Sequence, residues 1–157
     1  LTNPAFARRQ VLGVYSDDLV EVVARVLAAL GTTHALVVHS RDGLDEIAVS
    51  APTHVAEVRN GEVHAFEVTP ETFGVATHPI EALAGGDAKT NAGIAREVLE
   101  GKGGAREDVV VVNAGAALYV GGRASSLREG AAQAREAIRS GAALRKLNDL
   151  VEASREQ

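Results

Sequence analysis

The sequence contains no cysteine, no methionine and no tryptophan. Without cysteine the chain forms no disulfide, binds no metal through thiolates and has no cysteine nucleophile, which fits the reducing cytoplasm. Any metal site must therefore use oxygen and nitrogen ligands. Because no methionine is present to start translation, we expect the chain to be part of a longer polypeptide.

Positive charge, aromatic side chains and long apolar runs are also scarce. Lysine and arginine number 16 against 21 aspartates and glutamates, and only three Phe and two Tyr could stack on bases. Binding to nucleic acid is therefore not expected. The longest apolar stretch, from Val109 to Val120, is interrupted by Asn113 and by glycine, so we expect no membrane span. What remains is 157 residues, 46% of them apolar, which suits one globular domain.

A strand, a helix and a second strand are predicted at the start of the chain. Arg9–Tyr15 is typical of a strand, Ser16–Asp18 of a helix cap and Gly31 of a helix end. Ala35–His39 is a continuous apolar run, which indicates a strand covered on both faces, as in a parallel sheet. The order predicts a βαβ unit. The helix is expected to bury the apolar residues that recur at helical spacing, which are Leu19, Val22, Val23, Val26, Leu27 and Leu30.

The residues from His54 to Val68 predict a β-hairpin, because Asn60-Gly61 is the dipeptide that a two-residue type I′ turn prefers. A further strand is expected before it, at Ile47–Ser50. The turn fixes the register, in which the polar pairs bring opposite or potentially opposite charges together. The expected pairs are Arg59 with Glu62, Val58 with Val63, Glu57 with His64, Ala56 with Ala65, Val55 with Phe66 and His54 with Glu67.

Helices are predicted for the rest of the chain. Thr69–Leu83, with its prolines and short apolar clusters, is typical of a connection with a turn or two of helix. The valines of Arg106–Gly121 would suit a strand, but the length, the alanines and the acidic start of this run favour a buried helix. Further helices are expected after an Asp87 cap, from a capping box that opens at Ser126, and after Gly141.

The segment Ser40–Glu46 leaves the second strand of the βαβ unit, where sheets of this kind carry sites. It contains the adjacent pair Asp45-Glu46, with Asp42 close by and Gly43 to provide a bend. Hard divalent cations take oxygen ligands, and the small number of protein oxygens here favours Mg²⁺ over Ca²⁺. Asp45 and Glu46 are the best candidates for a metal site. A solvated acidic turn is the alternative interpretation of the same residues.

Other candidate residues are interpreted as structural. Gly85-Gly86-Asp87 precedes a helix and could bind phosphate, but an Asp87 cap would occupy the amides that a phosphate needs. Ser125-Ser126 lacks the context of a nucleophile elbow. His39 ends a strand near the acidic segment, yet a structural role is favoured for it. No pair of histidines has metal-binding helical spacing among His34, His39, His54, His64 and His78.

Several segments, in this order, together resemble the anthranilate phosphoribosyltransferase family. The resemblance covers essentially the whole chain and its motifs are specific. The matching segments are Leu1–Ala5, Gln10–Tyr15, Val38-His39, Asp42–Glu46, Gly85–Ala88, Asn91-Ala92, Asn113-Ala114, Ala116–Tyr119 and Ser126–Gly130. Ser40 departs from the family, which usually has glycine there. The fold implied is α/β, a mixed sheet flanked by helices, from the C-terminal portion of a nucleoside-phosphorylase/phosphoribosyltransferase-like catalytic domain.

The resemblance implies transfer of the phosphoribosyl group from phosphoribosyl pyrophosphate to anthranilate, with release of pyrophosphate, in tryptophan biosynthesis. The family uses two Mg²⁺ ions on the pyrophosphate, and Asp45 and Glu46 match its magnesium-binding pair. The resemblance assigns no catalytic residue to this segment. The enzyme is expected in the cytoplasm, as a homodimer formed through an N-terminal helical domain.

The family's other motifs lie upstream of Leu1. They are a glycine-rich phosphoribosyl pyrophosphate loop, a Lys-His-Gly-Asn segment, a metal-binding serine and an anthranilate-binding arginine. Residues 1–157 are therefore expected to form the C-terminal part of the α/β domain, without the helical domain and the first part of the α/β domain. The main substrate-binding residues lie outside this segment, and the segment alone is expected to be inactive.

Two rival interpretations stay open. A pyrimidine nucleoside phosphorylase shares this architecture and has an Asp-Glu pair after a strand, but Leu1–Pro4 and Gln10–Gly13 favour the anthranilate enzyme. The second rival is a non-catalytic relative that serves as a binding module. The upstream motifs would distinguish this relative from an enzyme.

Overall fold

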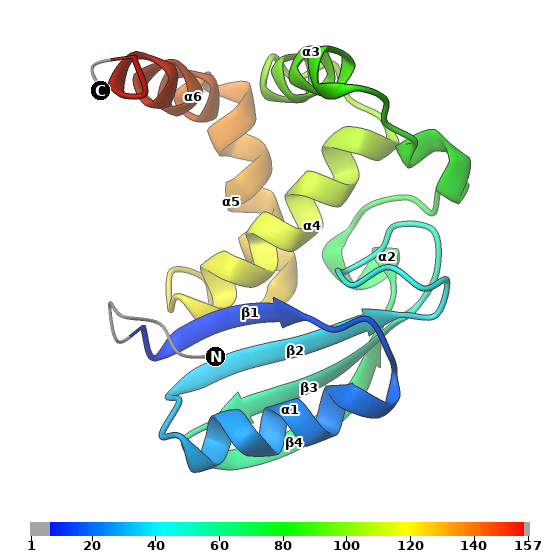
Figure 1. Cartoon of the computed structure of the whole chain (residues 1–157), viewed down its shortest axis with the longest axis vertical. Coiled ribbons are helices and arrows are strands. Elements are labelled where there is room, and N and C mark those ends of the chain that lie inside the picture. Colours follow the sequence, from blue (N-terminus) through cyan, green and yellow to red (C-terminus); the bar gives the residue numbers. More distant parts are fainter. Residues whose placement is uncertain (1–6, 156–157) are drawn as a thin grey trace.

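Four strands form a mixed sheet with helices packed on both of its faces (Figure 1). The computed structural model describes residues 7–155, so the Leu1–Ala5 motif lies outside the described residues. The strand order is β1-β2-β3-β4, and β1 lies at one edge. The elements are β1 (Arg9–Gly13), α1 (Asp18–Ala29), β2 (His34–Ser40), β3 (Thr53–Arg59), β4 (Glu62–Val68), α2 (Pro70–Phe73), the 3₁₀ helix η1 (Ile80–Leu83), α3 (Ala88–Leu99), α4 (Ala105–Val120), α5 (Leu127–Arg139) and α6 (Ala142–Ala153).

The predicted βαβ unit is confirmed, because β1 and β2 run parallel and α1 connects them. β2 is covered on both faces, as expected. Leu36 and Val38 belong to the core beneath α4 and α5, and Ala35 and Val37 belong to the core beneath α1. β3 runs antiparallel to β2, so the sheet is mixed. Since β1 and β2 are parallel, their C-terminal ends lie at the same end of the sheet. The segments that follow them, including the acidic segment, leave the sheet there.

The hairpin of β3 and β4 has the predicted register, from Arg59 opposite Glu62 to His54 opposite Glu67. The polar residues of the hairpin stand opposite one another as predicted, but their side chains bond other partners. β2, α4 and the start of α1 bring polar partners closer than the facing strand does. The observed partners are Asp17 for His54, Arg41 for Glu67, His34 and Tyr119 for Glu57, and Tyr119 for Arg59.

The strand expected at Ile47–Ser50 is wrong, because this segment is a loop whose first three residues are buried. Because β3 pairs directly with β2, no position beside β2 is left for Ile47–Ser50 in the sheet. Its backbone bonds to side chains instead. The Asn113 side-chain amide hydrogen-bonds both the N–H and the carbonyl of Ile47. The Ala48 N–H donates to Thr53 Oγ1 at 3.1 Å. The apolar run therefore reflects burial in a loop.

Helix α1 buries a face that is rotated from the predicted stripe. Val20 and Ala24 are fully buried, whereas Val22 is 51% and Val26 41% exposed. The buried side packs on small and β-branched residues of β2 and β3, which let the helix approach the sheet closely. Within the predicted stripe, Leu27 is buried, Leu19 and Val23 are partly buried, and Val22, Val26 and Leu30 are exposed.

The helix predicted over Arg106–Gly121 is confirmed as α4, which covers one face of the sheet together with α5. The two helices cross closely at glycines, because a methyl group at Gly130 would lie 2.2 Å from the Gly115 carbonyl oxygen. α3 and α6 lie beyond this pair, away from the sheet (Figure 1). α2 and η1 are the short helical turns expected within Thr69–Leu83. Within residues 7–155, no helix combines the length and the apolar character needed to cross a membrane.

Candidate metal centre

The acidic segment forms a tight turn directly after β2. The Gly43 N–H donates to the Ser40 carbonyl at 3.0 Å, and the Ser40 N–H donates to the Leu44 carbonyl at 2.9 Å. Gly43 has φ +95°, a left-handed conformation that glycine adopts without strain. The turn projects the next two residues, Asp45 and Glu46, at the edge of the sheet where β1 and β2 end.

Asp45 and Glu46 are exposed, and among residues 7–155 neither carboxylate has a hydrogen-bond or ion-pair partner. Partial burial and the neighbouring Asp45 charge raise the pKa of Glu46. Glu46 also lines a mostly apolar cavity of about 490 Å³ between the acidic segment, α3 and the start of α4, with Leu44, Ile94 and Arg106 among the other lining residues. No group in this described range therefore blocks the two carboxylates from taking a ligand from solution or from this cavity.

Asp42 does not join them. Its carboxylate accepts hydrogen bonds from the Ser40 hydroxyl at 2.5 Å and from the Ser50 hydroxyl. Burial raises the pKa of Asp42, but the hydroxyl donors outweigh burial and hold the pKa below its ordinary value. In the described part of the chain, no three His, Asp or Glu side chains come together as a metal site.

The donor set of Asp45 and Glu46 fits Mg²⁺. This ion takes one or two carboxylates from the protein and completes its shell with water and substrate phosphate oxygens. Among the described residues, this like-charged pair at the surface has no cationic partner that would compete for its oxygens. A Ca²⁺ ion would require more protein oxygens than this turn supplies.

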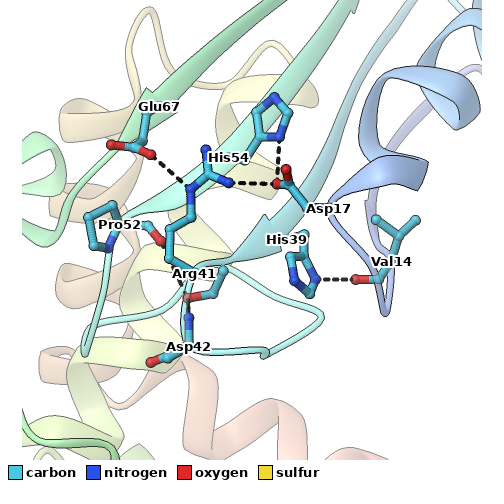
Figure 2. Close-up of polar contacts among 9 residues, drawn as sticks. Val14, Asp17, His39, Arg41, Asp42, Pro52, His54 and Glu67 are labelled. Carbon is cyan, nitrogen blue, oxygen red and sulfur yellow. Dashed lines mark hydrogen bonds and ion pairs between the residues drawn. The ribbon is translucent and has the colours of Figure 1, made fainter.

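A charged cluster ties the acidic segment, through Arg41, to β3, β4 and the residue before α1 (Figure 2). Arg41 donates to Asp17 at 3.0 Å and to Glu67 at 3.1 Å, and His54 lies 2.8 Å from Asp17. The hydrogen bond with His54, with a further contribution from Arg41, lowers the pKa of Asp17. The sequence predicts a helix cap at Ser16–Asp18. The Asp17 side chain, however, makes no capping hydrogen bond to α1. The cluster is internally satisfied and anchors the turn.

The structural interpretation holds for the other candidates. His39 Nδ1 lies 2.8 Å from the Val14 carbonyl oxygen, which it bonds as a donor (Figure 2). Asp87 caps α3 by accepting from the Thr90 N–H at 2.8 Å. Ser126 caps α5 as predicted. The reciprocal bond of the capping box differs, because the Glu129 carboxylate accepts from Ser125 instead of from the Ser126 backbone.

A second acidic pair, Glu107-Asp108, is buried at the start of α4. Arg135 of α5 donates to Glu107 at 2.9 Å and to Asp108 at 2.7 Å. His78 lies 2.8 Å from Asp108, and the Gly103 N–H donates to Glu107 at 2.8 Å. This network connects two helices and two loops, and its carboxylates are engaged by protein groups.

Sequence reasoning missed two residues that hold the acidic segment. Gly13, at the end of β1, lies so close to Asp45 that a methyl group there would be 1.5 Å from the Asp45 carbonyl oxygen. Asn113 of α4 bonds the backbone of Ile47. In the sequence both stand out only as parts of matching motifs. The available signal for Asn113 was a buried amide in an otherwise apolar helical run.

Comparison with protein families and curated proteins gives a consistent result. The family model described as "Glycosyl transferase family, a/b domain" matches residues 1–144. The chain is 52% identical over 156 residues to an anthranilate phosphoribosyltransferase of Desulfatibacillum aliphaticivorans and 53% identical to one of Rubrobacter xylanophilus. Each match covers 99% of this chain and 46% of the relative, in its C-terminal part.

Solved structures show the same relationship. An anthranilate phosphoribosyltransferase from Thermus thermophilus superposes with a TM-score of 0.81 at 40% identity, covering 89% of this chain and 41% of that one. The Saccharomyces cerevisiae enzyme in complex with PRPP and Mg gives a TM-score of 0.84 at 28% identity, covering 95% and 43%. From the family match and these relatives together, we conclude that the chain belongs to the glycosyl transferase family of α/β domains in which anthranilate phosphoribosyltransferases are found.

Proposed function

We propose that this chain forms the C-terminal part of an anthranilate phosphoribosyltransferase, which transfers phosphoribosyl from phosphoribosyl pyrophosphate to the amine of anthranilate. The observation that carries the proposal is the match over 99% of the chain to enzymes of that name at 52–53% identity. The carboxylates of Asp45 and Glu46, which have no partner within residues 7–155, support it independently. Solved relatives bind PRPP with Mg in one crystal and 4-fluoroanthranilate in another, which supports these substrates here.

Asp45 and Glu46 would hold magnesium at the edge of the sheet where β1 and β2 end. When bound, Mg²⁺ neutralises the negative charge that develops on departing pyrophosphate. The protein needs no covalent nucleophile for such a displacement, because positioning and charge stabilisation suffice. Asp45 and Glu46 therefore contribute carboxylate oxygens as metal ligands. Asp42 stabilises the turn that carries them by bonding Ser40 and Ser50.

The rest of the reaction machinery is proposed to lie upstream of Leu1. The chain spans 46% of the length of these two curated relatives. We propose that residues 1–157 form the later part of the α/β domain of such an enzyme. We expect this chain alone to be inactive, and the complete enzyme to be a homodimer that binds two Mg²⁺ ions per active site.

A chimera tests the proposal. In the chimera, this chain replaces the segment of the Rubrobacter xylanophilus relative that it matches, which is 46% of that relative's length. The upstream part of the relative is kept. We expect Mg²⁺-dependent release of pyrophosphate from phosphoribosyl pyrophosphate and anthranilate by the chimera and none by the isolated chain. The Asp45→Asn, Glu46→Gln double variant of the chimera should lose about 100-fold or more in kcat/KM, because metal charge stabilisation is worth several kcal/mol.

The matched control is Asp149→Asn with Glu152→Gln, which removes the same two charges from exposed positions of α6. It should retain the activity and the Mg²⁺ requirement of the parent chimera. An acid-pair variant with an unchanged Mg²⁺ requirement would show that Asp45-Glu46 is only a solvated turn. A chimera that consumes nucleosides and phosphate instead would favour the phosphorylase, and a folded chimera without either activity would favour a binding module.

A further inference from the structure

Ile47, the residue directly after the Asp45-Glu46 pair, is bonded on both backbone groups by one side chain. Asn113 accepts from the Ile47 N–H at 3.0 Å through Oδ1 and donates to the Ile47 carbonyl at 2.8 Å through Nδ2. A neighbouring strand would make the same kind of bonds. Ile47 is only 1% exposed, so little water can reach these groups. The amide therefore fixes the point at which the acidic segment enters the core.

Helix α4 does not itself require an asparagine at this position. Asparagine is a weaker helix former than leucine, and a buried amide costs about 1–3 kcal/mol when its groups are left unbonded. The amide of Asn113 makes one bond within the helix, to the Val109 carbonyl at 2.9 Å. Its other two bonds reach Ile47, 66 residues away in the chain. The need for this residue thus comes from the acidic segment.

The other side of the pair is held by Gly13 at the end of β1. A Cβ atom there would meet the Asp45 carbonyl oxygen at 1.5 Å and the carbonyl carbon at 2.5 Å. No side chain fits between the two backbones. Asp45 is therefore seated against the end of β1, while Ile47 is seated against α4.

The two ligand side chains need this support, because they repel one another and have no cationic partner in the described residues. A flexible turn would separate them and lose their shared direction. Metal ligands in proteins are commonly oriented by groups that do not touch the metal. On the basis of the function proposed above, we propose that Asn113, opposite Gly13, is a positioning residue that holds Asp45 and Glu46 in the geometry that binds Mg²⁺.

The variant Asn113→Leu in the chimera tests this proposal, because it keeps the size of the side chain and removes its bonds. The Mg²⁺ concentration for half-maximal velocity should rise about tenfold, as loss of an orienting group typically costs 10- to 100-fold in metal affinity. The KM for anthranilate should be unchanged. Two readouts do not depend on turnover. Binding of Mn²⁺ with pyrophosphate, followed by electron paramagnetic resonance, should weaken similarly, and the peptide containing Ile47 should exchange its amide hydrogens faster.

Tyr119→Phe is the matched control. Tyr119 lies on the same helix and donates to Glu57 at 2.8 Å, so its loss removes a tertiary hydrogen bond away from the acidic segment. Tyr119→Phe should lower thermal stability and leave the Mg²⁺ requirement unchanged. The proposal is overturned if Asn113→Leu lowers the melting temperature as Tyr119→Phe does but leaves Mn²⁺ binding and the Mg²⁺ requirement at parent values.

Failure of this inference differs from failure of the proposed function. If the Asp45→Asn, Glu46→Gln variant loses its Mg²⁺-dependent activity while Asn113→Leu keeps the parent's half-maximal Mg²⁺ concentration and Mn²⁺ binding, only the positioning role is refuted. If the acid-pair variant also keeps the parent's Mg²⁺ requirement, the metal site itself is refuted. Should Asn113→Leu not fold, Asn113→Ser removes the direct bonds but leaves room for water, and a smaller shift in the same direction is required.

Discussion

This chain has two pairs of consecutive acidic residues that look alike in sequence but differ in burial and in bonding partners. Asp45-Glu46 is exposed and has no bonding partner among the described residues. Glu107-Asp108 is buried, with exposed fractions of 4% and 9%, and is engaged by Arg135, His78 and the Gly103 amide. The charge of the buried pair, Glu107-Asp108, is therefore compensated by protein groups.

Under the proposed function, the difference separates carboxylates that hold the fold together from carboxylates that bind a ligand. A buried carboxylate is tolerated when a cation and hydrogen-bond donors are built around it. A carboxylate that binds a metal must keep an oxygen open to it, and backbone contacts elsewhere on its segment can hold it in position. Gly13 and Asn113 provide those contacts for Asp45-Glu46, without offering a charge that would compete with a metal.

The largest expected effect comes from removing the cation of the buried pair. Arg135→Met should lower the free energy of unfolding by about 3–5 kcal/mol, because both carboxylates lose their shared partner. Thermal unfolding of the chimera measures this, and Arg139→Met, on the exposed side of the same helix, should change it little. The acid-pair variant at Asp45-Glu46 should also stay within about 0.5 kcal/mol of the parent. Equal losses for Arg135→Met and the acid-pair variant would remove the distinction drawn here.

A smaller effect is expected at the end of β1. Gly13→Ala forces the Asp45 backbone away, which should cost about 1–3 kcal/mol of stability and raise the Mg²⁺ concentration for half-maximal velocity. Gly93→Ala is the control, because a methyl group there meets no atom within 4 Å and alanine favours the helix. A Gly13→Ala chimera with parent-like stability would contradict the close contact.

The smallest effect concerns Asp17, whose side chain is 44% exposed and bonds His54 and Arg41. Its pKa lies below the ordinary value of 3.8 because His54 and Arg41 favour the charged form. The stabilisation is therefore complete above that ordinary value and is lost as the pH falls through the lowered pKa. Asp17→Asn should cost at most about 1 kcal/mol at neutral pH, and the difference should shrink on acidification. Unfolding measured across the pH range checks this, with Asp18→Asn as control, and a pH-independent loss would argue against the charge pair.

Local chemistry made part of the fold predictable. The Asn60-Gly61 turn fixed the hairpin register correctly, because a two-residue turn leaves the strands no other alignment. The strand expected at Ile47–Ser50 was wrong, since an apolar run does not show whether its backbone will meet a strand or a distant side chain. The partner here, Asn113, is 66 residues away. The rotated face of α1 has a similar cause, because the sheet beneath the helix selects which apolar residues fit.

The candidate site was found from the sequence only in part. Oxygen ligands after a strand indicated Asp45-Glu46, and the family resemblance strengthened that prediction. The residues alone could not separate this pair from Glu107-Asp108, because the deciding partner, Arg135, is 28 positions from Glu107. Polar partners that come from other elements determine which carboxylates stay free, and spacing along the chain does not reveal them.

The position of β1 in the sheet has a practical consequence for handling this polypeptide. Within residues 7–155, no strand pairs with the outer side of β1, so its backbone amides and carbonyls there form an open template. Open templates of this kind recruit extended segments from other molecules and seed precipitation. At high concentration the isolated 157-residue chain is expected to precipitate, and adding a polypeptide whose extended segment pairs with β1 should keep it in solution.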